Sequence, residues 1–318
     1  MKSFSTISEQ IDLLQSRGVL ISDIEKSKQY LLTNNYYNVI NGYSKFFQNK
    51  HNEYISGTSF DEITQVYFYD TEIKFILFKA IIEAERHFKS VFAYRFAEQY
   101  QSLNFAYLRT SSYKEESLLQ VSKSISILTR ILNDKKKAKQ ANSIKHYLNN
   151  HQDVPIWVII DQLTFGNVIH IYNHVSYSLK NSIAKDLTSF LSDNVLQLSK
   201  PFTVETLESF LKNMVEIRNV CAHNNRLLGY TCRENIKYLD EIHTPYKIKK
   251  NDSRQNVFNV MISLQSLLSK TQYAQLHNTI LKRTRNLDKK LTTISVNEIT
   301  KELGIPTNWQ TSTEKLPQ

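Results

Sequence analysis

The chain has 318 residues, with 40 Lys or Arg, 30 Asp or Glu, and a net charge of +10. Only 6 Gly and 5 Pro are present, far fewer than turn-dense β sandwiches and barrels require, so a mostly helical fold is expected. The glycines are too widely spaced for a dinucleotide fingerprint or a phosphate-binding loop, and two cysteines cannot build a disulfide framework or a four-cysteine metal site.

Signals for secretion and for membrane insertion are absent from the sequence pattern. The first 14 residues carry three charged side chains and lack an apolar signal core. The densest apolar runs, Phe75–Phe78 and Val154–Ile160, are far shorter than the roughly 20 residues of a membrane helix. We therefore expect a cytoplasmic protein with no membrane partner, whose positive charge suits a polyanion.

Helix starts are recognisable in the first third of the chain. Three segments have the capping-box pattern: Thr6–Glu9, Ser22–Glu25 and Ser59–Glu62. The first predicts a helix that stops at Gly18, and the second predicts one that runs to about Thr33. The third opens the stretch from Phe60 to Tyr100, which lacks Gly and Pro and has apolar residues at helical spacing. One or two long helices are expected there.

The remaining pattern is also helical. A helix over Ser117–Leu148 is predicted to end in a basic run, and Asp153 is predicted to cap the next helix with Pro155 in its first turn. That helix is expected to break at Thr164–Asn167 and to restart toward Tyr177. Thr203 predicts the cap of a strong helix that runs from Val204 to about Arg226. Two further helices and an irregular tail are predicted at Arg254–Ser269, Thr271–Leu281 and Ile305–Trp309.

No repeat or low-complexity linker interrupts the chain. We therefore expect a single all-α domain over residues 1–318. It is expected to comprise an N-terminal helical part at 1–58, a helical core at 59–240 and a basic C-terminal helical extension at 241–318.

The segment Glu216–Arg226 has the composition of a reactive site. It follows an apolar stripe at spacings of three and four residues, namely Leu207, Phe210, Leu211, Met214, Ile217 and Cys221. On a helical wheel Arg218 lies at the border of this stripe, and three further polar residues lie beside it: Asn219, His223 and Arg226.

These side chains suit phosphodiester chemistry. The guanidinium of Arg218 matches a phosphate, His223 can transfer a proton near neutral pH, and Asn219 can orient the imidazole. No metal is required when the attacking group is the 2′-hydroxyl of RNA. The spacing alone is common, however, and the alternative is that Arg218 pairs with Glu216 or another acid while His223 is a solvated helix-end residue.

The motif Arg218-Asn219-x-x-Ala222-His223-x-x-Arg226 resembles the active motif of HEPN ribonucleases in their abortive-infection form. Other segments, in the same order along nearly the whole chain, are similar to the AbiD/AbiF-like proteins of the Abi family: Ser8–Gly18, Leu31–Phe47, Pro155–Val158, Leu163–Gly166 and Gly304–Trp309.

The resemblance implies an all-α, HEPN-like helical bundle with additional N- and C-terminal helices. It implies a metal-independent endoribonuclease without cofactors that acts in abortive infection and phage defence, or as the toxin of a toxin–antitoxin pair. Arg218, Asn219 and His223 carry over as the catalytic residues. Members of this type dimerise with two motifs facing one cleft, and some are associated with a small structured RNA. RNA and a second copy of the chain are therefore the expected partners.

Basic runs are candidate phosphate contacts. The RNA-binding residues expected are Arg226, Lys135, Lys136 and Lys137, and further runs occur at Lys247–Lys250 and Lys282–Arg285. A solvated charged face is the alternative for each run alone. The leading interpretation is thus an endoribonuclease, against a non-catalytic RNA-binding regulator or a protein–protein interaction module.

Other clusters favour packing over chemistry. His170 and His174 have a metal-compatible spacing but no evident third ligand, so no metal is expected. Five aromatic residues could stack on bases, but core packing is the favoured interpretation for them: Tyr36, Tyr37, Tyr43, Phe46 and Phe47. Trp157 and Phe165 are likewise expected in the core.

Overall fold

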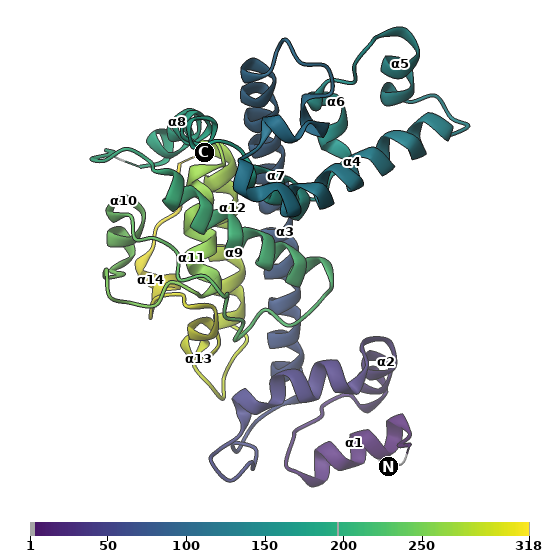
Figure 1. The fold of residues 1–318 in the computed structure, drawn as a ribbon. Helices are drawn as coiled ribbons and strands as arrows, with labels where there is room; N and C mark the ends of the chain where they lie inside the picture. The colour runs from purple at the N-terminus through teal and green to yellow at the C-terminus, as the bar shows by residue number, and fades with distance from the viewer. Residues whose placement is uncertain (1–3, 196, 318) are drawn as a thin grey trace.

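The computed structural model describes residues 4–195 and 197–317, and these form an all-α protein (Figure 1). Helix accounts for 68% of the residues, and within the described ranges only isolated β-bridges occur, such as Leu20 with Ser59. The prediction of an all-α fold is confirmed.

Nine helices in these ranges have eight or more residues: α1 (Ile7–Ser16), α2 (Ile24–Asn34), α3 (Phe60–Gln99), α4 (Leu118–Lys137), α5 (Ser143–Asn150), α7 (Phe165–His174), α8 (Tyr177–Asn194), α9 (Val204–Ala222) and α12 (Lys270–Asp288). Five are shorter: α6 (Ile156–Ile159), α10 (Asp240–His243), α11 (Val257–Ser263), α13 (Val296–Thr300) and α14 (Trp309–Ser312). A π-helical turn, Tyr37–Asn41, follows α2, and short 3-10 turns join several of the helices.

Helix α3 is the spine of the molecule (Figure 1). Its 40 residues make it about 60 Å long at ~1.5 Å per residue. It begins at a complete capping box, in which the Ser59 and Glu62 side chains each accept a hydrogen bond from the other residue's amide. Helices α12, α9 and α8 pack along it, and α1 and α2 lie near its N-terminal end. Consequently α3 contacts the N-terminal part, α9 and the C-terminal part of the chain.

Local capping signals predicted some helix starts correctly. The capping box at Thr6 and the single long helix after Ser59 are confirmed. The second predicted box is wrong, because Asp23 rather than Ser22 caps α2 by accepting a hydrogen bond from the Lys26 amide at 3.0 Å.

The prediction of one helix over Ser117–Leu148 is wrong, because helix α4 ends at Lys137. The side-chain oxygen of Asn142 caps a new helix, α5, by accepting a hydrogen bond from the Lys145 backbone amide, and its side-chain nitrogen donates to the Lys135 carbonyl. The cap prediction at Asp153 is also wrong. Its carboxylate accepts instead from the amide of Phe105, and α6 begins without a side-chain cap. The Asp153 carboxylate therefore binds a residue distant in sequence and does not cap the helix that follows it.

The structure confirms one predicted core residue and corrects another, and it changes the predicted bounds of two helices. Phe165 is buried as expected, but Trp157 is 56% exposed, so the core prediction for Trp157 is wrong. Helix α12 runs to Asp288, beyond its predicted end, and the segment after Arg254 becomes helical only at Val257. The Arg254 guanidinium explains the late start, since it donates to three backbone carbonyls of the preceding loop.

Candidate functional site

Helix α9 carries the motif, and the sequence specifies both the residue at which this helix begins and the face that it buries. Thr203 caps it by accepting a hydrogen bond from the Thr206 amide at 3.2 Å, and Glu205 in the first turn complements the helix dipole. The side chains of the predicted stripe are buried at Leu207, Phe210, Leu211, Met214 and Ile217. The stripe faces the core, and the polar residues beside it therefore reach toward the surface.

The helix ends four residues earlier than predicted. Ala222 is its last residue, and the His223 amide donates to the Asn219 carbonyl at 3.0 Å as the cap. Asn224 then has φ of 53°, a left-handed conformation that Asn tolerates better than most residues and that ends the helix. The predicted helical position of Arg226 is thus wrong, because Arg226 lies in the loop that follows.

Arg218 is half-buried on the flank of α9 and is held by a ring. Its guanidinium carbon lies 5.6 Å from the ring centroid of Phe78 in α3, and one of its nitrogens is 3.4 Å from the side-chain oxygen of Asn219. In the described ranges no carboxylate forms an ion pair with it. Glu216 instead accepts hydrogen bonds from the Tyr230 hydroxyl and the Arg233 amide. The alternative in which Arg218 pairs with an acidic neighbour is therefore wrong.

His223 lies at the exposed C-terminal end of α9. Its imidazole has no hydrogen-bond partner among the described residues, and Asn219 beside it is exposed as well. The structure brings Arg218 and Asn219 into contact, but no side-chain hydrogen bond joins either of them to His223. An exposed helix-end histidine is present, as the alternative expected, and its side chain is accessible from solvent.

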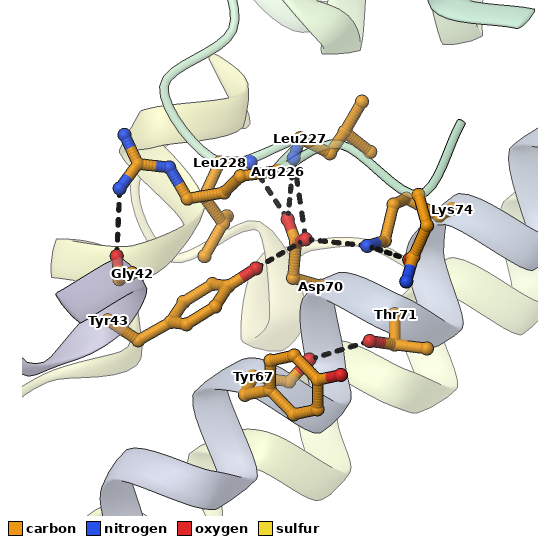
Figure 2. A network of polar contacts seen from close by, with 10 residues as sticks. Gly42, Tyr43, Tyr67, Asp70, Thr71, Lys74, Arg226, Leu227 and Leu228 are labelled. Atoms are coloured by element: carbon orange, nitrogen blue, oxygen red, sulfur yellow. Dashed lines mark hydrogen bonds and ion pairs between the residues drawn. The ribbon is translucent and has the colours of Figure 1, made fainter. Parts of the chain in front are cut away.

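Directly after the motif, the chain is held by a buried carboxylate that the sequence did not single out. Asp70 of α3 is fully buried and accepts hydrogen bonds from the amides of Leu227 at 3.1 Å and Leu228 at 2.8 Å. The Tyr43 hydroxyl donates to it at 2.7 Å, and the Lys74 ammonium lies 3.5 Å away (Figure 2). The carboxylate therefore joins three separate segments of the chain.

Lys74 extends this arrangement to the motif itself. It is 4% exposed and donates to the side-chain oxygen of Asn224 at 2.7 Å, one residue after His223. Asp70 and Lys74 are four residues apart on α3, so their side chains lie on the same face. We call Tyr43, Asp70, Lys74 and Asn224, with the amides that Asp70 binds, the Asp70 network.

Arg226 links the motif loop to the N-terminal part. Its guanidinium donates to the Gly42 carbonyl at 2.8 Å, while the side chain remains exposed (Figure 2). One of its nitrogens is thus engaged in structure, and the charge itself has no ion-pair partner in the described ranges.

The basic runs lie in different environments. Lys135 is half-buried and Lys136 and Lys137 are exposed at the end of α4. These lysines share no hydrogen bond with the motif residues in the described part of the chain. In the run near residue 283, by contrast, Arg283 pairs with Glu72 at 2.7 Å, and Arg285 donates to backbone carbonyls, so both have structural roles.

The two thiols are poor candidates for a nucleophile. Burial raises the pKa of Cys221 and of Cys232 to about 12, so each stays protonated at neutral pH. Cysteine chemistry is therefore not what this site offers.

His170 and His174 are packed together on α7, with ring centroids 4.8 Å apart, and the His170 ring also contacts the Ser124 hydroxyl at 2.9 Å. Burial lowers the pKa of both imidazoles. Over residues 4–195 and 197–317, no group of three or more His, Cys, Asp or Glu side chains is arranged to hold a metal.

Comparison with known proteins addresses the family. The model of the family described as Abi-like protein matches residues 29–229, which include the motif and all of the Asp70 network. The chain belongs to the Abi-like protein family. Membership suggests a role in abortive infection, a defence against phage. No curated protein and no solved structure matches the chain.

None of the described helices of the Abi-like chain combines the length and the apolar character that crossing a bilayer demands.

Proposed function

We propose that this Abi-like protein is a metal-independent endoribonuclease of the HEPN type. In this proposal it acts in abortive infection, or as the toxin of a toxin–antitoxin pair. The observation that carries it is the environment of Arg218: a guanidinium that lies against an aromatic ring, without a carboxylate, on a helix that ends at an exposed histidine five residues later. A cation kept unneutralised at a surface is suited to an anionic ligand, and RNA supplies a phosphate at every residue.

The proposed roles follow from side-chain chemistry. Arg218 stabilises the negative charge that develops on the scissile phosphate through its planar guanidinium. His223 moves the proton of the ribose 2′-hydroxyl, since an imidazole nitrogen can accept a proton and pass it on. Asn219 contacts the Arg218 guanidinium and keeps it on the flank of α9. Attack by the 2′-oxygen leaves a 2′,3′-cyclic phosphate and a 5′-hydroxyl, and DNA is spared because it lacks that oxygen.

Arg226 and the α4 lysines are proposed to bind the RNA backbone. Arg226 keeps part of its guanidinium exposed beside the motif, and Lys136 and Lys137 are exposed on α4. Each phosphate that these side chains neutralise releases counterions, so the affinity for RNA should fall steeply as salt rises. A small structured RNA is a candidate partner on the same surface.

We also propose that the protein forms a homodimer through α3. Three of its exposed apolar residues, Phe68, Phe75 and Ile82, follow one another at seven-residue intervals and so lie along one side of the helix. Phe78, which supports Arg218, lies between the last two on the same side. A two-fold axis across this stripe would pair identical surfaces and bring two motifs toward each other.

The central experiment compares RNA cleavage by the wild-type protein with that by Arg218→Ala and His223→Ala. We expect each substitution to lower the cleavage rate by roughly 10²-fold or more, the range for loss of a charge-stabilising or proton-transferring group. Arg130→Ala, at an exposed arginine outside the motif, is the control and should leave the rate unchanged. Arg218→Lys separates charge from geometry, because lysine keeps the charge but not the planar fork.

Two other outcomes would favour the alternatives. RNA binding without cleavage by the wild type would indicate a non-catalytic regulator. Neither binding nor cleavage, together with self-association through α3, would indicate an interaction module. For the dimer, Phe75→Glu should shift the sedimentation coefficient to that of a monomer and abolish cleavage, and a wild-type monomer that cleaves RNA would contradict the dimer.

A further inference from the structure

A pocket of about 490 Å³ opens directly beside the motif. Its walls combine the π-helical turn after α2, one side of α3, and the loop that follows His223. Its volume lies within the range of pockets that hold small molecules. Asn224, which lines it, is the residue next to His223 in the chain, so the pocket continues the candidate site.

The lining has the chemistry of a nucleotide site. Three tyrosines, Tyr37, Tyr67 and Tyr230, offer aromatic faces, and Tyr37 is 69% exposed even though aromatic side chains are normally buried. Flat aromatic rings stack on nucleic-acid bases regardless of sequence. The expectation that Tyr37 packs in the core is therefore wrong, whereas Tyr43 and Phe47 are buried as expected.

Two amides can read a base edge. Asn38 and Asn41 both lie on the π-helical turn, and both are exposed. Their side chains have no hydrogen-bond partner within the described ranges. Each carries two donors and an acceptor, the combination that pairs with the edge of a base. Asn35, with φ of 60°, precedes this turn, and its side-chain oxygen accepts a hydrogen bond from the Tyr37 amide, so the start of the turn has a defined geometry.

The charge of the pocket is positive. Arg226 and Lys74 line it, and no carboxylate does so among the described residues. Asp70 lies beneath and neutralises Lys74, which leaves the exposed Arg226 as the cation for a phosphate. Backbone contacts from Asp70 and Gly42 hold the loop, so the pocket is built before any ligand arrives.

We propose that this pocket holds one nucleotide of single-stranded RNA beside the bond that is cut, with its base against Tyr37, its edge read by Asn38 and Asn41, and its phosphate on Arg226. The proposal rests on the proposed function, because it gives the RNA substrate a defined register relative to His223. It also predicts that cleavage prefers one base at a fixed distance from the cut.

Binding is tested with His223→Ala protein, which prevents cleavage, and fluorescent single-stranded RNA. We expect Tyr37→Ala to weaken the affinity for RNA about five-fold or more, the lower end of the cost of removing a stacking ring. The double variant Asn38→Ala with Asn41→Ala should weaken it by a similar factor, because it removes the hydrogen bonds to the base edge. Tyr94→Ala, at an exposed tyrosine near the far end of α3, is the matched control and should change it less than two-fold. Equal affinities for all variants would overturn the proposal.

Two further arms separate the pocket from the chemistry. Free mononucleotides are tested as ligands in their own right, and binding of a mononucleotide by a protein that binds no single-stranded RNA would overturn the RNA assignment. Cleavage of a random-sequence RNA pool then reports base preference. A base preference that the wild type shows and the double variant Asn38→Ala with Asn41→Ala loses would support the proposal. If the double variant keeps the preference, and cleavage is still abolished by His223→Ala, the pocket proposal is overturned and the proposed function stands. RNA binding that needs Tyr37 without cleavage overturns the proposed function and leaves the pocket assignment standing.

Discussion

The Asp70 network and the end of α9 are joined by residues 224–228, yet charged groups have partners in the first region and lack them in the second. At Asp70, one fully buried carboxylate is matched by two backbone amides, a tyrosine hydroxyl and an ammonium group. At the end of α9, Arg218 has no carboxylate and the His223 imidazole has no hydrogen-bond partner in the described ranges. Buried polar groups with all their partners stabilise a structure, whereas an arginine without a carboxylate and an exposed histidine without a hydrogen-bond partner are available to a ligand.

Removing the buried charge should give the largest effect. Asp70→Asn keeps the shape of the side chain but leaves Lys74 buried without a counter-charge. We expect the free energy of unfolding, measured by urea denaturation, to fall by about 3–5 kcal/mol. The double variant Asp70→Asn with Lys74→Met should recover part of this loss, because no uncompensated charge then remains. A loss below about 1 kcal/mol for the single variant would show that the network is not structural.

A buried histidine, His243, sharpens the comparison through the pH dependence of stability. Burial lowers the pKa of His243 to about 4, with the Arg254 charge adding to the shift and the Leu239 backbone and Asp240 opposing it. The unfolded chain therefore binds a proton at higher pH than the folded chain, and stability falls as pH drops from about 6.5 toward 4. For this group alone we expect a loss of about 2 kcal/mol between pH 7.5 and pH 5.

The variant His243→Asn removes this buried titrating group and should make the pH dependence of the free energy of unfolding shallower. Asn219→Ala, which changes an exposed side chain without an ionisable group, is the control and should leave that dependence unchanged. Equal pH profiles for His243→Asn and the wild type would contradict the assignment.

A smaller loss is expected for one hydrogen bond of the network. Tyr43→Phe removes the hydroxyl that donates to Asp70 at 2.7 Å but keeps the ring. The free energy of unfolding should fall by about 1.5–3 kcal/mol, as for a hydrogen bond to a charged group. Tyr37→Phe is the control, since that ring is largely exposed, and it should change stability by less than about 0.5 kcal/mol.

The smallest effect on stability is expected at the motif. His223→Ala and Asn219→Ala both change exposed side chains, so the free energy of unfolding should stay within about 0.5 kcal/mol of the wild type. The same variants should nevertheless lose cleavage. A stability loss above about 1.5 kcal/mol for either would place the motif among the structural elements.

Features that depend on near neighbours in sequence were predictable. The caps at Thr6, Ser59 and Thr203 each use a side chain three residues from its partner, and the stripe on α9 repeats every three or four residues. The polar motif was also visible, because its members lie within nine positions of one another.

Features made by distant residues were not predictable. Asp70 meets residues 157 and 158 positions away, and a carboxylate within a long helix gives no sign of such partners in the sequence. One feature of the sequence did point to Asp70: it stands four residues before Lys74, a spacing that places the two opposite charges on the same face of a helix. The early end of α9 could have been inferred from Asn224, which tolerates the left-handed conformation.

The most direct test of the proposed chemistry is the nature of the RNA ends after cleavage in the presence of EDTA. We expect cleavage to continue, to leave a 2′,3′-cyclic phosphate and a 5′-hydroxyl, and to stop when the 2′-oxygen at the cut is methylated. His223→Ala should yield neither product. Cleavage that EDTA abolishes and a divalent metal restores, or equal cutting of a DNA strand of the same sequence, would contradict attack by the 2′-hydroxyl.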